Sequence, residues 1–160
     1  MERDILEDFQ LSKNNRCLIA SPINHLPLVR EFISDKPDFF RVAEKINKYQ
    51  LVNVGDISWP EHVAIWTIPA KASVSYNIPL LIWGENGQNE YGGPASESTK
   101  KILDRRWVEE FGGLNGFRVK DLLNYPDIKE EDLIGYTYPN DQDVSKVGTT
   151  GLYLGYYFEW

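Results

Sequence analysis

A dense group of polar side chains directly follows an apolar run near the middle of the chain. The segment IPLLIWGENGQNEYGG covers residues 78–93, and its second half carries two acids, two asparagines and one glutamine among glycines. Glu85 and Glu90 can hold a magnesium ion, which prefers oxygen ligands and often bridges to phosphates. Asn86 can hydrogen-bond a phosphate or a sugar, and Gly84 allows a sharp turn or a close approach of the backbone to a ligand. A hydrogen-bonded polar turn at the edge of a sheet is the alternative interpretation.

A second group of candidate residues lies at the entrance of an apolar helix, in the segment GDISWPEH. The functional interpretation places His62 against a substrate, with Asp56 and Trp59 beside it. The structural interpretation is that Asp56 or Ser58 caps the helix and that Trp59 packs against it as a hydrophobic staple. The sequence leaves both interpretations open.

The C-terminal segment VGTTGLYLGYYFEW is rich in glycine and aromatic residues. Tyr153, Tyr156 and Tyr157 can stack on the face of a sugar and orient it through their hydroxyl groups. A core strand with alternating aromatic side chains explains the same pattern. The Gly-Thr-Thr-Gly run at residues 148–151 can cradle a phosphate through its backbone N–H groups. Because no Lys-Ser/Thr pair follows it, however, this run is not a P-loop signature.

The composition limits the class of protein. The chain has 160 residues, of which 42% are hydrophobic and 26% charged, and this suits a folded domain with its own core. The formal net charge of -7 argues against a nucleic-acid partner, because affinity for phosphate backbones comes mainly from Lys and Arg. We interpret the basic pairs Lys100–Lys101 and Arg105–Arg106 as a solvated helix face.

Cysteine usage and hydropathy narrow the class further. Cys17 is the single cysteine of the sequence, so no disulfide can form within the chain, and we expect this residue to lie buried in a strand. No apolar stretch reaches the length of a membrane span, and the polar N-terminus does not resemble a signal peptide. We therefore expect a soluble protein that works in the cytoplasm.

The order of apolar segments predicts an α/β fold. The runs RCLIASP and IPLLIW are typical of buried strands in a parallel sheet. A short helix is predicted within residues 1–15, and further helices over residues 26–35, 37–49 and 61–77. The last of these is apolar all round, and Pro69 should kink or split it. In open α/β sheets ligands bind just beyond the carboxyl ends of the strands, which is where the GENGQNE segment falls.

The pattern weakens after residue 93. Helices are predicted over residues 97–111 and 117–124, a further turn of helix near residues 129–133, and a strand or an extended loop from residue 147. We interpret the chain as a single domain over residues 1–160. Its α/β part would cover residues 1–93 and end in the GENGQNEYGG loop, and its helical and extended part would cover residues 94–160.

Several segments resemble one enzyme family. They are WPEHVAIWTIPAKASVSYNIPLLIWGENGQNEYGGP, FGGLNGF, YTYPND and VGTTGLYLGYYFEW. Together they resemble the N-acetyl sugar amidotransferases, which belong to the wider PP-loop ATP pyrophosphatase group. The resemblance covers roughly residues 50–160. The GEN-x-Q-x-EYGG block is its most specific element, because few families combine such a block with a preceding buried helix.

The resemblance implies both a fold and a reaction. The fold would be part of a PP-loop, adenine nucleotide alpha hydrolase-like parallel sheet with flanking helices, followed by an irregular aromatic-rich C-terminal portion. The enzymes of this family convert the N-acetyl group of a sugar to an acetamidino group during synthesis of bacterial surface polysaccharides such as lipopolysaccharide O-antigens. ATP and magnesium activate the acetamido oxygen as an adenylate, and ammonia from a partner glutaminase then displaces AMP. The substrate would be a sugar or a nucleotide-sugar.

The resemblance also implies a set of site residues. In related PP-loop enzymes, including tRNA lysidine synthetase, a strand is likewise followed by a Gly-x-Asn loop with acids. By that analogy the catalytic residues are Glu85, Asn86 and Glu90, with Glu85 and Glu90 as magnesium ligands. The expected substrate contacts are Asp56, Trp59, His62, Gln88, Tyr91, Tyr153, Tyr156 and Tyr157.

Two parts of the family pattern are missing from this sequence. It has no Ser-Gly-Gly-x-Asp-Ser phosphate-binding loop and no cysteine-rich N-terminal segment. We therefore expect the chain to be a fragment of a longer enzyme that lacks the PP-loop. The alternatives are a non-catalytic module that binds a nucleotide-sugar, or a shortened homologue without ATPase activity. A scaffold domain that docks onto a glutaminase is a third interpretation, and no exposed amphipathic stripe in the sequence supports it.

Overall fold

The computed structural model describes residues 17–20, 39–84, 86–97 and 102–158. The helices predicted within residues 1–15 and over residues 26–35 lie outside these ranges. Among the residues that the structure describes, no helix combines the length and the apolar character needed to cross a membrane.

A parallel sheet holds the first and last parts of the described chain together. It has the strand order β1-β2-β3, with β1 at Cys17–Ala20, β2 at Leu80–Trp83 and β3 at Thr150–Tyr153. Leu80 of β2 is aligned with Cys17 on one side and with Thr150 on the other. The prediction of an α/β fold with parallel strands is therefore confirmed at this coarse level. The tail is a strand over four residues, as one of the two predictions for it stated.

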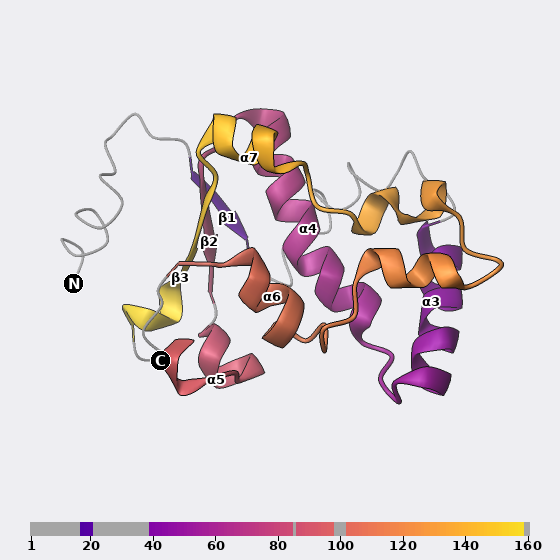
Figure 1. The fold of residues 1–160 in the computed structure, drawn as a ribbon. Coiled ribbons are helices and arrows are strands. Elements are labelled where there is room, and N and C mark those ends of the chain that lie inside the picture. Colours follow the sequence, from indigo (N-terminus) through magenta and orange to yellow (C-terminus); the bar gives the residue numbers. More distant parts are fainter. Residues whose placement is uncertain (1–16, 21–38, 85, 98–101, 159–160) are drawn as a thin grey trace.

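The central helix α4 spans Trp59–Tyr76 and lies between the sheet and the helices on the far side of the molecule (Figure 1). Its apolar surface is buried almost all round, because it packs against α3, the sheet and the later helices. The predicted split at Pro69 is wrong, because α4 is one continuous helix of 18 residues that contains Pro69. Pro69 removes one backbone N–H, but burial on several sides stabilises the helix despite that loss. Asn77 ends it in the left-handed conformation, with φ of 54°.

The helix before α4 is longer than its sequence pattern indicated. Helix α3 spans Phe39–Asn53, whereas residues 37–49 were predicted. Val42 and Ile46 place its apolar stripe in the core, as the periodicity predicted. The chain turns back toward α4 at Gly55, where φ is +77°.

Short helices dominate the second half of the chain. They are α5 (Gly87–Tyr91), η1 (Ala95–Glu97), α6 (Arg105–Phe111), η2 (Val119–Asn124), η3 (Glu130–Tyr136), α7 (Asp141–Val147) and η4 (Leu154–Tyr156), where η denotes a 3-10 helix. Three sequence predictions need correction. The segment after β2 contains a helical turn rather than only a loop, and α7 was not predicted. Within the described part of the helix predicted over residues 97–111, α6 begins only at Arg105, where the Asp104 carboxylate caps it by accepting from the Arg106 N–H at 2.9 Å.

The two faces of the sheet belong to different clusters. Leu81, Trp83 and Tyr153 point to the same face and join the main core with α4. Leu80 and Leu152 point to the opposite face and pack with Tyr157. This alternation follows from the two-residue period of strands. The carboxyl ends of β2 and β3 therefore present Trp83 and Tyr153 side by side, aligned in register, toward the main core.

Candidate functional site

The carboxyl ends of β2 and β3 bring two distant parts of the chain together. Asn86 lies three residues beyond β2, and Gly155 lies two residues beyond β3. The Asn86 side chain donates from Nδ2 to the Gly155 carbonyl at 3.4 Å. The Asn86 N–H donates to Oε1 of Glu90 at 3.0 Å. These two bonds fix the loop after β2 both to its own helical turn and to the chain that leaves β3. We call this region, formed by Asn86, Glu90 and Gly155, the carboxyl edge.

The structure describes some of the residues predicted to be functional at this edge and not others. Glu85 lies outside the described residues, and Gln88 belongs to α5 but its side chain is not described. The Glu90 side chain is exposed, and one of its oxygens accepts the Asn86 N–H, as a helical capping carboxylate does. Over the described ranges, no group of three or more His, Cys, Asp or Glu side chains is placed to hold a metal ion.

An aromatic cluster lies under the carboxyl edge. Its members come from α4, β2, α5, α6, β3 and η4 and are His62, Trp66, Trp83, Tyr91, Trp107, Tyr153 and Tyr156. Most of the ring pairs meet edge to face, at centroid distances such as 5.6 Å for Trp66 and Tyr91. A Cβ added at Gly87 would lie 3.0 Å from the Tyr153 ring, so the cluster also fixes the start of α5. The loop of interest is thus supported by packed rings.

His62 contributes the imidazole ring of the aromatic cluster, and packing holds it from two sides. Its ring meets the Tyr91 ring edge to face at 5.7 Å. The Gly113 backbone approaches so closely that an added Cβ would lie 2.8 Å from Cγ and Nδ1 of His62. The buried Nδ1 atom has no hydrogen-bond partner in the part of the chain that the structure describes. His62 and Tyr91, both predicted substrate contacts, are therefore neighbours.

Asp56 lies close enough to His62 to interact with it electrostatically. The Ser58 N–H and hydroxyl donate to Oδ1 of Asp56 at 2.8 and 2.7 Å, and Asn115 donates to Oδ2 at 3.4 Å. Chiefly through the two bonds from Ser58, the pKa of Asp56 is held below its ordinary value, with the His62 charge adding a smaller effect in the same direction. Asp56 thus shapes the turn before α4. Ser58 is the N-cap residue but makes no side-chain capping bond.

Two predicted substrate contacts lie elsewhere. The Trp59 side chain is 2% exposed, packs on Phe117 and Tyr136, and donates from Nε1 to the Phe117 carbonyl at 3.0 Å. Tyr157 packs with Leu80 on the opposite face of the sheet. Trp59 is therefore a core residue, and Tyr157, although only two residues beyond Gly155, packs on the face of the sheet opposite to the aromatic cluster.

The aromatic side chains of the glycine-rich tail lie mainly in the core rather than on an open surface. Tyr153 is only 3% exposed, and Tyr156 is half-buried beside it at a centroid distance of 6.1 Å. Gly148 ends α7, and its N–H and that of Thr149 donate to the Val144 carbonyl. The Thr150 N–H donates to the Pro79 carbonyl at 2.7 Å. These N–H groups have partners within the fold, so the Gly-Thr-Thr-Gly run does not form a phosphate cradle.

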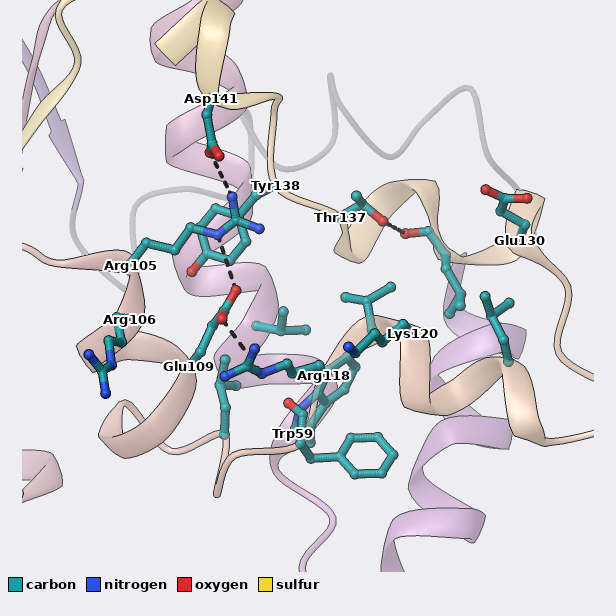
Figure 2. A pocket seen from close by; sticks show the side chains of 16 residues that line it. Trp59, Arg105, Arg106, Glu109, Arg118, Lys120, Glu130, Thr137, Tyr138 and Asp141 are labelled. Carbon is teal, nitrogen blue, oxygen red and sulfur yellow. Dashed lines mark hydrogen bonds and ion pairs between the residues drawn. The ribbon is translucent and has the colours of Figure 1, made fainter. Parts of the chain in front are cut away.

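A cavity that the sequence did not predict lies on the other side of α6. It has a volume of about 620 Å³ and is lined by residues of α4, α6, η2, η3 and the start of α7 (Figure 2). Arg105 lies on an exposed helix face, as predicted, and there its Nε pairs with Glu109 at 3.1 Å and its NH1 with Asp141 at 2.8 Å. The i,i+4 spacing of Arg105 and Glu109 was a visible signal of that pairing, but nothing in the sequence linked either residue to α7.

Comparison with known proteins adds no further identification. No model of a known protein family matches the chain, and no curated protein is significantly similar to it.

Proposed function

We propose that the chain belongs to an ATP-dependent amidotransferase that converts the N-acetyl group of a sugar to an acetamidino group. The observation that carries this proposal is the GEN-x-Q-x-EYGG block at the carboxyl end of a parallel strand. Ligands of open α/β sheets bind at that end. The resemblance of this block to the N-acetyl sugar amidotransferases of the PP-loop group supplies the reaction class.

The proposed chemistry solves a specific problem of amide reactivity. An acetamide carbonyl is a poor electrophile, and its oxygen is a poor leaving group. Attack of that oxygen on the α-phosphorus of ATP releases pyrophosphate and forms an O-adenylate. Ammonia then adds to the amide carbon, and AMP departs with the oxygen while the nitrogen loses its extra protons. The sugar keeps an acetamidino group in place of its acetamido group.

The residues of the carboxyl edge have roles that fit this reaction. Asn86 is fixed by its bonds to Gly155 and Glu90, so its amide group can position a substrate with little loss of conformational freedom. Tyr91 and His62 lie in contact beneath the same loop and are the proposed contacts to the sugar. Asp56, whose pKa is held below its ordinary value chiefly by the hydrogen bonds from Ser58, lies close enough to His62 to interact with it electrostatically.

A magnesium ion fits the donor chemistry of this loop. One oxygen of Glu90 accepts the Asn86 N–H, and within the part of the chain that the structure describes its second oxygen accepts no hydrogen bond. Carboxylate oxygens are the ligands that magnesium prefers, and Glu85 is the proposed second ligand. When bound, the metal would neutralise charge on the phosphates of ATP. The proposed ammonia source is a partner glutaminase, and use of ATP and a nucleotide-sugar implies a cytoplasmic location.

Binding of nucleotide and sugar by this chain tests the proposal. Calorimetric titrations with Mg-ATP and with UDP-N-acetylglucosamine should both show binding. Asn86→Ala and Glu90→Gln should each weaken binding of Mg-ATP by about tenfold, because each removes a charged or hydrogen-bonding contact. Asn124→Ala and Glu131→Gln are matched controls on exposed side chains of η2 and η3, and both should leave affinity unchanged.

A turnover assay beside the titrations separates the proposal from its rivals. Formation of AMP that depends on both ammonium chloride and the acetamido sugar would support the amidotransferase. Binding of the sugar with no effect of Mg-ATP would instead favour a non-catalytic nucleotide-sugar module. If both carboxyl-edge variants bind Mg-ATP with unchanged affinity, this loop is not part of the nucleotide site.

A further inference from the structure

Trp66 lies one helical turn after His62 on α4, and its side chain is 0% exposed. Residues four apart on a helix share a face, so the two side chains leave α4 on the same side. The indole N–H of Trp66 donates to the Gly112 carbonyl at 3.0 Å. This bond ties α4 to the loop that follows α6.

The bond from Trp66 fixes one of the two surfaces that enclose the His62 ring. Gly113, whose backbone approaches Cγ and Nδ1 of His62, directly follows Gly112 in the chain. The Gly112 N–H donates to the Val108 carbonyl at 2.9 Å, and a Cβ added at Gly112 would lie 3.3 Å from Nε1 of Trp66. The loop thus lies close to both side chains, and the Trp66 bond to its carbonyl holds it there.

Trp66 also holds the second surface, which is the Tyr91 ring. The Trp66 and Tyr91 rings meet at a centroid distance of 5.6 Å and an interplanar angle of 64°. Tyr91 in turn meets His62 at 5.7 Å and 85°. Trp83 of β2 packs on Trp66 at 5.7 Å, so the sheet limits how far the indole can move. Trp66 therefore contacts both neighbours of His62.

The enclosure affects the two ring nitrogens of His62 differently. Nδ1 is buried and has no hydrogen-bond partner among the described residues. A proton on Nδ1 would be a buried donor without an acceptor, which is costly. In the neutral ring, the tautomer with its proton on Nε2 avoids that cost. Because Nδ1 is covered while His62 as a whole is only partly buried, Nε2 is also the ring nitrogen that a ligand could reach.

We propose that Trp66 is a positioning residue of the proposed sugar site. Through the Gly112 carbonyl and the Tyr91 ring, it holds the imidazole in the orientation in which Nε2–H donates to an oxygen of the acetamido sugar. This inference rests on the proposed function, in which His62 and Tyr91 contact the sugar. Trp66 itself touches no substrate. It keeps the imidazole in one orientation and one tautomer, so that little conformational freedom is lost when the sugar binds.

Trp59 provides a matched control on the same helix. It is 2% exposed, and its indole N–H donates to the Phe117 carbonyl at the same distance of 3.0 Å. Its ring packs on Phe117 and Tyr136, which do not belong to the aromatic cluster. Trp59→Phe and Trp66→Phe therefore remove the same donor and the same part of an indole. Only Trp66→Phe does so beside the neighbours of His62.

The tautomer of His62 in the ligand-free chain is the first readout. Proton–nitrogen correlation spectra should place the imidazole proton on Nε2 in the wild type, and His25→Gln identifies which of the two histidines gives each signal. Trp66→Phe should shift His62 toward a mixture of tautomers, whereas Trp59→Phe should not. A loss of stability alone lowers the urea midpoint of both variants without changing the tautomer of the folded chain. A wild-type proton on Nδ1, or an unchanged spectrum in Trp66→Phe, would overturn the proposal.

Sugar affinity is the second readout, and it separates this inference from the proposed function. In calorimetric titrations, Trp66→Phe should bind UDP-N-acetylglucosamine about tenfold more weakly than the wild type, because the hydrogen bond from Nε2 is no longer oriented. Trp59→Phe should bind it as the wild type does. Wild-type affinity in Trp66→Phe, or an equal loss in both variants, would contradict the positioning role. No binding of the sugar by the wild-type chain would instead refute the proposed function itself.

Discussion

Replacing Gly113 by alanine should damage the fold at the point where His62 is held. Gly113 has a φ of +78°, and a Cβ at this position would lie 2.8 Å from both Cγ and Nδ1 of His62. These atoms belong to the base of a packed ring, which cannot swing aside as the end of a flexible side chain can. The substitution therefore combines backbone strain with direct overlap.

The two contributions can be separated with a second glycine. Gly148 has a φ of +71°, but no atom lies within 4 Å of its added Cβ. Gly148→Ala should thus cost only the backbone strain, about 1–2 kcal/mol of unfolding free energy. Gly113→Ala should cost that amount plus about 1–3 kcal/mol for overpacking. Urea denaturation of both variants measures the difference.

A double-mutant cycle with His62 assigns the extra cost to the contact. In the His62→Ala background the overlap is absent, so Gly113→Ala should there cost about as much as Gly148→Ala does. The coupling free energy between positions 62 and 113 should reach about 1–3 kcal/mol. If the two glycine variants are equally destabilised, or if His62→Ala does not relieve the cost, the packing argument for His62 is wrong.

Three further predictions test other parts of the structure. The hydrogen bonds of Asp56 lower its folded-state pKa, so its contribution to stability is present above about pH 4 and is lost as the pH falls through the folded-state value. In urea denaturation at a series of pH values, Asp56→Asn should flatten this part of the profile, and an unchanged slope would contradict the assignment. Asn140→Ala removes the acceptor of the Asp143 N–H at 2.8 Å and should cost about 1 kcal/mol. Amide exchange should then accelerate within α7, and no local change would argue against this cap. Leu122 is 0% exposed and Leu123 is 47% exposed, so Leu122→Ala should cost about 2–5 kcal/mol and Leu123→Ala far less. Similar urea midpoints for these two variants would refute the burial of Leu122.

The strands and the central helix could be predicted because their sequence patterns match their surroundings. Continuous apolar runs mark β1 and β2, since a parallel strand is buried on both faces. The absence of a polar face predicted a buried α4. The continuation of α4 through Pro69 could not be predicted, because propensity counts the missing hydrogen bond but not the packing from α3, the sheet and η3. Tertiary contacts therefore determine that α4 stays helical at Pro69.

The shorter elements and the cavity left much weaker signals. Helix α7 buries no residue, so it has no apolar periodicity, and only Asn140 at its start and Gly148 at its end mark it. The cavity is assembled from elements that lie far apart in the sequence, and spacing along the chain does not reveal such a meeting. At the carboxyl edge, the sequence placed Asn86 and Glu90 in one loop, but the bond from Asn86 to Gly155 became visible only with β3 aligned on β2.

The pairing of β2 with β3 has a consequence for the order of folding. Leu80 must find Thr150 across a long intervening chain, and closing such a loop is slow compared with forming the helices inside it. During synthesis, β2 emerges well before β3, and its free edge exposes unpaired N–H and C=O groups in the meantime. We expect the Asn86–Gly155 contact to form late, after the helices have collapsed around α4. The docking of β3 onto β2 would then cover the free edge of β2 and complete the carboxyl edge in the same step.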